Sequence, residues 1–211
     1  METKANTYQC GIIGGGLAGL CLAIQLADKG ISVVLFEKNK YLFHKVCGEY
    51  IRLESWNFIE RLGLNLSQFN LPSIKKLIVS SPDGNYIKSN LDLGGFGISR
   101  YLLDNKLREI GVENGVIICE GTKVNDVIFN EEKFTVKYNG GEITSSMVAG
   151  SFGKRSNLDI KWKRDFIKQK SNKLNNYIGV KYHIKTQFPA DTIALHNFKN
   201  KSIRVLVATD I

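Results

Sequence analysis

The sequence of 211 residues has few of the residues that build disulfide scaffolds or metal clusters. Its four cysteines show no metal-ligand spacing, and three of them, Cys10, Cys21 and Cys119, fall at apolar positions typical of buried thiols. No stretch approaches the roughly 20 apolar residues that span a membrane. Residues 1–7 are polar and lack the apolar core of a secretory signal. These absences predict a cytoplasmic protein with reduced thiols.

Histidine is also scarce, and the three histidines, His44, His183 and His196, are isolated from one another in the sequence. An isolated histidine is more often a structural residue than a catalyst. The sequence contains no convincing catalytic triad, metal cluster, internal repeat or low-complexity linker. Hydrophobic residues make up 43% of the chain and charged residues 23%, which is typical of a globular protein with a real core.

The net charge of +9 is concentrated at the C-terminal end. Residues 1–150 contain 16 Lys and Arg and 16 Asp and Glu, whereas residues 151–211 contain 13 and 4. In residues 151–211, lysines and arginines are interleaved with Trp162, Phe166 and Ile167, as on a basic amphipathic surface. We favour a solvated face here over peripheral membrane contact or an acidic substrate, and we expect no nucleic-acid partner. The oligomeric state stays open.

A glycine-rich motif, GIIGGGLAGL, occupies residues 11–20. An apolar run that predicts a buried strand precedes it, and apolar residues at helical spacing follow it up to Lys29 and Gly30. Residues 31–36 predict a second strand, which Glu37 closes. The order of strand, glycine turn, helix, strand and acid predicts a dinucleotide-binding βαβ unit.

Each part of such a unit has a physical task. Gly14 permits the tight turn, Gly16 lets the backbone approach a pyrophosphate, and Gly19 lets the helix pack closely on the strand. The helix N-terminus offers unpaired N–H groups to phosphates. Glu37 can accept hydrogen bonds from ribose hydroxyls, and its charge disfavours the 2′-phosphate of NADP. The alternative is a plain glycine turn in an ordinary α/β unit.

The rest of the chain predicts further helices and strands. Residues 53–64 and 98–112 have helical spacing, and a turn at Pro82 to Asn85 predicts a hairpin between residues 74–79 and 86–88. The other expected strands are residues 116–118, a meander of 124–129, 133–138 and 142–144, and residues 178–184, 192–196 and 203–208. Residues 147–149 form a further apolar run.

With these elements, the sequence resembles FAD-dependent oxidoreductases of the p-hydroxybenzoate hydroxylase fold, up to about His196. The closer likeness is to the geranylgeranyl-reductase-like and aromatic-ring monooxygenase branches. Besides the glycine motif, residues 45–49 (KVCGE) are similar to the reductases' cysteine-glycine motif, residues 98–107 to the helix-opening arginine segment, and residues 122–124 to the adenine-contacting strand. Arg100 could equally be a surface helix cap, and Val124 plain sheet packing.

The resemblance implies an α/β fold with a Rossmann-like FAD-binding βαβ domain, an inserted β-meander and part of an antiparallel-sheet substrate domain. The implied domains are residues 1–72 and 97–158 for FAD, with 73–96 and an incomplete 159–211 for the substrate. The implied cofactor-binding residues are Gly14, Gly15, Gly16, Leu17, Ala18, Gly19, Glu37, Lys38, Lys45, Gly48, Arg100 and Val124.

The sequence departs from the family pattern at two places. Phe152 stands where the family usually has an aspartate that serves the pyrophosphate region and pyridine-nucleotide docking. The family's late Gly-Asp motif has no counterpart, because the chain ends at Thr209-Asp210-Ile211. We therefore expect a chain truncated at its C-terminus.

The resemblance implies an FAD-dependent monooxygenase or reductase of an unsaturated or aromatic small molecule, with a lipophilic substrate as one option and NAD(P)H as a candidate electron donor. Cys47 is the one residue nominated near the chemistry, although a packed loop cysteine explains it about equally well. The alternative is an inactive dinucleotide-binding module. An NAD-dependent dehydrogenase is disfavoured, because the meander and the Arg100 segment fit FAD proteins better.

Overall fold

The computed structural model describes residues 7–154, 156–168, 178–200 and 202–209. The chain divides into two compact units. Unit 1 comprises Met1–Phe43 and Asp104–Ile178, and unit 2 comprises His44–Leu103 and Gly179–Ile211. No helix among the described residues is both long and apolar enough to cross a membrane.

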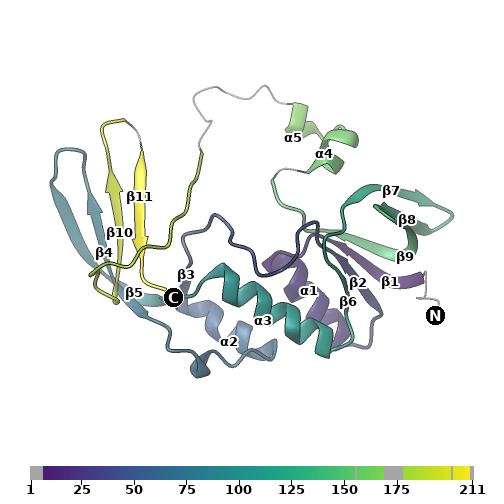
Figure 1. Ribbon diagram of the computed structural model, residues 1–211, viewed down its shortest axis with the longest axis horizontal. Coiled ribbons are helices and arrows are strands. Elements are labelled where there is room, and N and C mark those ends of the chain that lie inside the picture. The colour runs from purple at the N-terminus through teal and green to yellow at the C-terminus, as the bar shows by residue number, and fades with distance from the viewer. Residues whose placement is uncertain (1–6, 155, 169–177, 201, 210–211) are drawn as a thin grey trace. The chain divides into compact units, whose positions relative to one another are not determined.

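Unit 1 is built on a six-stranded sheet with the strand order β6-β2-β1-β9-β8-β7 (Figure 1). β1 pairs in parallel with β2 and β9, and β2 pairs in parallel with β6. β8 and β7 extend the sheet beyond β9 as an antiparallel meander. The strands are β1 (Thr7–Ile13), β2 (Val33–Phe36), β6 (Ile117–Cys119), β7 (Val124–Asn130), β8 (Lys133–Tyr138) and β9 (Gly141–Gly150). The expected α/β fold with a meander is confirmed.

The βαβ unit forms because its strands and helix bury their apolar residues together. Every residue of β2 is buried, as expected for a parallel strand that is covered on both faces. α1 (Leu17–Ala27) packs on β1 and β2 through a stripe that includes Leu20, Ala23 and Ile24. The chain leaves α1 through Gly30, whose φ of +74° is in the left-handed region that suits glycine.

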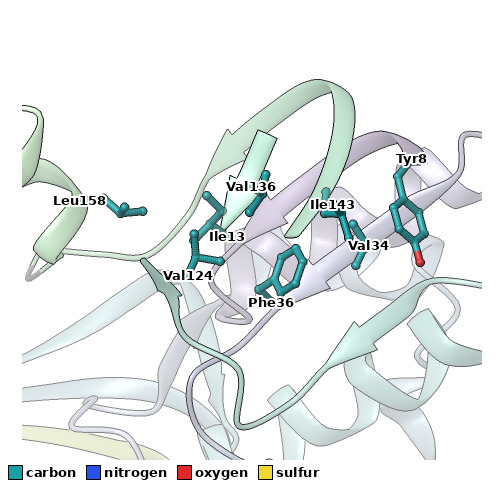
Figure 2. Packing of buried hydrophobic residues seen from close by; sticks show 8 residues of the cluster. All are labelled: Tyr8, Ile13, Val34, Phe36, Val124, Val136, Ile143 and Leu158. Atoms are coloured by element: carbon teal, nitrogen blue, oxygen red, sulfur yellow. The ribbon is translucent and has the colours of Figure 1, made fainter. Parts of the chain in front are cut away.

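An apolar cluster joins β1 and β2 to the meander (Figure 2). The Phe36 ring lies at its centre and packs against the ring of Tyr138, with 5.0 Å between the centroids. Burial of each such side chain contributes about 1.5–3 kcal/mol. The buried members are Tyr8, Ile13, Val34, Phe36, Val124, Val136, Ile143 and Leu158.

Unit 2 is built on a five-stranded sheet with the order β11-β10-β4-β5-β3 (Figure 1). β4 and β5 form the hairpin, β10 pairs with β4 in parallel, and the other neighbours are antiparallel. The strands are β3 (Tyr50–Arg52), β4 (Ser73–Ser80), β5 (Tyr86–Gly97), β10 (Thr192–Asn197) and β11 (Ile203–Val207). The remaining elements among the described residues are η1 (Leu53–Ser55), α2 (Trp56–Arg61), η2 (Leu66–Gln68), α3 (Arg100–Glu113), α4 (Asn157–Lys161) and α5 (Asp165–Lys168).

Four sequence expectations need correction. The expected strand at residues 178–184 is wrong, because residues 178–189 belong to no helix or strand. The expected helix at 53–64 splits into η1 and α2 and ends at Arg61. β3 lies where no strand was expected, and β9 continues beyond the expected strand at 142–144 through the apolar run at 147–149. Of the cysteines, Cys10 is buried, whereas Cys21 and Cys119 are half-buried; no disulfide joins any of the four.

Candidate functional site

The glycine turn lies between β1 and α1 and leaves no room for side chains at two positions. Gly14 has φ +108°, and a Cβ there would lie 2.5 Å from the carbonyl oxygen of Ser151. A Cβ at Gly19 would overlap the carbonyl oxygen of Gly14. These contacts explain why glycine is required at both positions, as the motif predicts.

The N-terminus of α1 is free to receive an anion. Gly16 is the N-cap and has no side chain to cap the helix, and the first turn contains no acidic residue. The first helical hydrogen bond runs from Leu20 N–H to Gly16 O, at 2.9 Å. The amides of Leu17, Ala18 and Gly19 are therefore not used within the helix, and they point from the positive end of the helix dipole. This arrangement fits a phosphate group.

Glu37 is tied directly to the glycine turn. Its carboxylate accepts the Gly15 N–H at 2.8 Å and the Asn39 N–H at 3.0 Å, and the residue is only 6% exposed. A carboxylate has lone pairs for about four hydrogen bonds, so Glu37 retains capacity for the hydroxyls of a ribose. The structure thus brings the predicted phosphate-binding and ribose-binding groups of unit 1 together. Lys38, the next residue, is exposed.

Tyr41 is a residue of this site that sequence reasoning missed. Its hydroxyl donates to the carbonyl oxygen of Gly15 at 2.8 Å, and a Cβ at Gly15 would collide with that hydroxyl. Burial, reinforced by the negative charges of Glu37 and Glu120, raises the pKa of Tyr41 far above its usual value, so the phenol stays neutral. The signal in the sequence was an aromatic residue in the polar loop directly after the second strand.

Val124 lies at the start of a strand that the backbone connects to Glu37. Glu37 N–H donates to Cys119 O at 3.0 Å, and Thr122 N–H donates to Glu37 O at 2.8 Å. The Val124 side chain is 6% exposed and belongs to the apolar cluster. Sheet packing therefore accounts for the side chain, while contact of its backbone with adenine stays a prediction.

The segment after β9 holds the glycine turn in place through hydrogen bonds from Ser151. Ser151 N–H donates to Ile13 O at 2.8 Å, and the Ser151 hydroxyl donates to Gly14 O at 2.7 Å. Phe152, which stands where the resemblance expects an aspartate, packs its ring against the cluster and against Trp162, with 6.2 Å between centroids. The position is thus used for packing and carries no charge toward a cofactor.

The remaining predicted residues, Lys45, Cys47, Gly48 and Arg100, belong to unit 2. Two of them contact Glu49: the Glu49 N–H lies 3.5 Å from Cys47 Sγ, and Arg100 N–H donates to Glu49 Oε1 at 2.8 Å. Gly48 is exposed and has open space around its Cα. Contact of these four residues with a cofactor stays a prediction.

Sequence reasoning also missed Glu49 as a site residue and treated the histidines as isolated. In the structure, the rings of His44 and His183 meet edge to face, with 4.7 Å between centroids, and His183 pairs with Glu49. His196 lies elsewhere in unit 2, where its Nδ1 pairs with Ser80 Oγ. No group of three or more His, Cys, Asp or Glu residues suitable for a metal ion occurs in the described part of the chain.

Comparisons with known proteins agree with this geometry. Residues 12–46 match the family model of the NAD(P)-binding Rossmann-like domain. The chain is 28% identical over 159 residues to digeranylgeranylglycerophospholipid reductase 2 of Methanothermobacter thermautotrophicus, covering 72% of this chain and 40% of that protein.

Two solved structures share the fold. The myxobacterial chondrochloren halogenase, an FAD-dependent halogenase, matches with a TM-score of 0.66 and 17% identity, over 92% of this chain and 48% of that one. The p-nitrophenol 4-monooxygenase of Pseudomonas putida matches with a TM-score of 0.63 and 19% identity, over 72% and 43%. The chain spans less than half the length of each of these three proteins. Residues 12–46 thus match a Rossmann-like domain, the chain shares the fold of a flavin-dependent monooxygenase and halogenase, and it is similar in sequence to a digeranylgeranylglycerophospholipid reductase.

Proposed function

We propose that the protein is an FAD-dependent oxidoreductase that reduces an unsaturated, lipophilic small molecule. The observation that carries the proposal is the buried carboxylate of Glu37, held at the glycine turn beside the uncapped N-terminus of α1. This combination suits a dinucleotide with an unphosphorylated ribose. The fold shared with an FAD-dependent halogenase favours FAD over NAD as that dinucleotide.

The residues of unit 1 fit the parts of FAD in turn. The amides of Leu17, Ala18 and Gly19 would bind the pyrophosphate, the Glu37 carboxylate would bind the adenosine ribose, and the backbone near Val124 would contact adenine. When bound, the flavin supplies the two-electron transfer, while the protein binds, orients and excludes water. NAD(P)H is the proposed electron donor.

We prefer a reductase to a monooxygenase because sequence similarity supports the reductase, whereas only a shared fold supports the monooxygenase. The reductase is a relative in sequence, at 28% identity over most of this chain. The monooxygenase and the halogenase are below 20% identity, so they inform on the fold. The name of the reductase points to a lipid substrate, and a lipophilic alkene is accordingly the class we propose.

One observation favours a second candidate, a dinucleotide-binding module without catalysis. Phe152 packs into the apolar cluster at the position where the resemblance expects an acidic residue for pyridine-nucleotide docking. An absorbance spectrum of the purified protein, followed by an NADH and NADPH oxidation assay, separates the two. Flavin absorbance with oxidation of either nucleotide supports the enzyme, whereas flavin without oxidation supports the module. If the purified protein contains no flavin and takes up no added FAD, both candidates fail, because both assume that the protein binds FAD.

A further inference from the structure

Both polar groups of the Gly15 backbone bind side chains from the segment that begins at the end of β2. The Gly15 N–H donates to Glu37 Oε2 at 2.8 Å, and the Gly15 carbonyl oxygen accepts the Tyr41 hydroxyl, also at 2.8 Å. One residue in the middle of the glycine turn is thus held by its donor and by its acceptor. Because glycine has more backbone freedom than any other residue, two such bonds remove much of the freedom of the turn.

The position of Tyr41 also explains why residue 15 is a glycine. The backbone of Gly15 does not have the positive φ that Gly14 has, so its conformation alone would accept another residue. A Cβ at Gly15 would, however, overlap the Tyr41 hydroxyl and lie 2.8 Å from the Cβ of Glu37. Glycine at position 15 therefore makes room for the two side chains that bind its backbone.

Tyr41 is held at its backbone as well as at its hydroxyl. Its N–H donates to Glu120 Oε2 at 3.0 Å, and Glu120 Oε1 lies 2.8 Å from Nε and 2.7 Å from a terminal nitrogen of Arg108. Arg108 lies in α3, and Glu120 follows β6. The ion pair fixes the carboxylate, and the carboxylate fixes the backbone of Tyr41. Three segments of unit 1 that are distant in the sequence thus determine where this hydroxyl lies.

The Tyr41 hydroxyl is always the donor in its bond to the turn. Burial, reinforced by the carboxylates of Glu37, Asp104 and Glu120, raises the pKa of Tyr41 far above its usual value. The phenol therefore keeps its proton at neutral and moderately alkaline pH. The Gly15 carbonyl oxygen can only accept a hydrogen bond. The bond consequently has one direction, and it is present whenever the loop is folded.

This bond sets the direction of the next amide in the chain. The Gly15 carbonyl and the Gly16 N–H belong to one trans peptide group, in which the C=O and N–H bonds point in opposite directions. When the carbonyl is held toward Tyr41, the Gly16 N–H is directed away from Tyr41. Among the described residues no acceptor binds the Gly16 N–H, and Gly16 is the N-cap of α1. This amide thus joins those of the first turn of α1 that a phosphate can use.

We propose that Tyr41 is a positioning residue for the pyrophosphate of the bound dinucleotide. Its hydroxyl holds the peptide between Gly15 and Gly16 so that the Gly16 N–H donates to a phosphate oxygen. This inference rests on the proposed function. Tyr41 acts through the backbone and needs no contact with the ligand. A turn that is already held in its binding conformation loses little freedom when the ligand arrives, and such preorganisation strengthens binding without an added contact.

Two competing explanations give Tyr41 another role. In the first, the hydroxyl only ties the loop to the turn, so every variant that still folds binds the ligand equally well. In the second, Tyr41 covers the turn and has to leave before a ligand binds. The three explanations differ in the effect of Tyr41→Phe on affinity: positioning predicts weaker binding of a pyrophosphate, a structural tie predicts no change, and a cover predicts tighter binding.

Titration of the purified apoprotein with ADP and with adenosine separates these explanations. ADP contains the adenine, the ribose and the pyrophosphate that unit 1 is proposed to bind, whereas adenosine lacks the pyrophosphate. We would follow both titrations by ¹H–¹⁵N NMR, which also measures weak binding, at a temperature well below the unfolding midpoint of each variant. Loss of one neutral hydrogen bond corresponds to roughly threefold to tenfold in affinity. Tyr41→Phe should therefore weaken ADP by this factor and leave adenosine unchanged.

Two further variants and one resonance complete the test. Glu37→Gln should weaken ADP and adenosine alike, because both ligands carry the ribose. Tyr86→Phe, which removes a hydroxyl from a residue that is 61% exposed in β5, should affect neither. The Gly16 amide resonance should move downfield when ADP binds to the wild type, and it should move less in Tyr41→Phe. Should that variant fail to fold, titration of the wild type with inorganic pyrophosphate decides, since a Gly16 amide that does not respond would overturn the inference.

The outcomes distinguish this inference from the proposed function. An unchanged or a tighter ADP affinity in folded Tyr41→Phe, or equal losses for ADP and adenosine, would refute the role of Tyr41 and leave the proposed function intact. A wild-type protein that binds ADP but not FAD would refute the proposed function and leave the test of Tyr41 valid. A wild-type protein that binds neither would refute both.

Discussion

Glu37 and Glu49 are both buried carboxylates, but their surroundings suit them to different tasks. Glu37 accepts hydrogen bonds from the backbone amides of Gly15 and Asn39, so its negative charge is not neutralised by those partners. Glu49 accepts from an ammonium group and an imidazole, and its charge is compensated within unit 2. Glu37 can therefore hold a neutral polyol such as ribose, whereas Glu49 serves to orient other side chains.

Glu37→Arg should weaken FAD binding, because it removes the ribose acceptor and places a cation in a buried site. Loss of a charged hydrogen bond costs on the order of 1.5–3 kcal/mol, or roughly tenfold to a hundredfold in affinity. Fluorescence titration of the apoprotein with FAD measures this change. Glu37→Gln gives a milder test of the same contact, and Glu142→Arg, at an exposed position of β9, is the control. An unchanged titration curve for both Glu37 variants would remove this residue from the site.

Gly14→Ala should destabilise unit 1 far more than Gly30→Ala. Both residues have positive φ, so both substitutions carry the left-handed penalty of about 1–2 kcal/mol. Only the Cβ at Gly14 also meets backbone, 2.5 Å from Ser151 O, whereas nothing lies within 4 Å at Gly30. Thermal or urea unfolding of the two variants compares the costs. Equal costs would mean that the turn relaxes easily and does not hold its shape for a ligand.

Cys47→Ser should alter turnover or substrate choice more than FAD content. The serine keeps the volume and a weak donor at the position where Sγ receives the Glu49 N–H. The resemblance places this motif beside the flavin without a covalent bond to it. Denaturation followed by gel filtration checks the second half: flavin should leave the wild-type protein. Flavin that stays with the wild type but leaves the variant would make Cys47 a covalent anchor.

At the scale of elements, the local sequence pattern predicted most helices and strands of unit 1 but fewer of those of unit 2. The turn between β1 and α1 could be read from the sequence because neighbouring residues make it: strand, glycines, helix and Glu37 follow one another. β3 could not, since three residues carry little periodic signal and the strand exists through pairing with the distant β5. Residues 178–184 alternate like a strand, but alternation reports side-chain direction rather than pairing.

The Glu49 contacts were beyond sequence reasoning for a related reason. Lys181 and His183 come from the segment after residue 178, and Arg100 opens α3. Their meeting depends on how the segments of unit 2 fold together, which neither spacing nor composition encodes. By contrast, the requirement for glycine at positions 14 and 19 could be predicted, because the backbone geometry of this turn recurs in dinucleotide-binding units.

The attachment of this segment should depend on pH through Glu49. The lowered pKa means that the folded carboxylate is ionised at pH values where the unfolded one, with its usual value of 4.5, is already protonated. Its stabilisation is fully present above pH 4.5 and is lost as the pH falls through the lowered folded value. Urea unfolding at neutral and acid pH should therefore show Glu49→Gln less stable than wild type by about 1–3 kcal/mol at neutral pH, with the gap closing in acid. A gap that persists unchanged in acid would contradict an ionised Glu49.

At the scale of the whole molecule, the two units carry different polar clusters. Unit 1 carries the glycine turn, Glu37 and the strand of Val124, and unit 2 carries the buried Glu49 with its partners Lys181 and His183. The basic C-terminal region belongs partly to each; in unit 1, Arg164 pairs with Asp159 and lies over the Trp162 ring. Whether that region is a solvated face or a surface for a partner stays a prediction.

The central claim is that unit 1 binds FAD, and one measurement tests it most directly. The purified protein is denatured in acid, the released small molecules are separated and identified, and the apoprotein is then titrated with FAD and with NADH. The account predicts that FAD is released, or that FAD rebinds and NADH does not compete for the glycine turn. Binding of NAD(H) alone, with FAD neither co-purifying nor reconstituting, would contradict it.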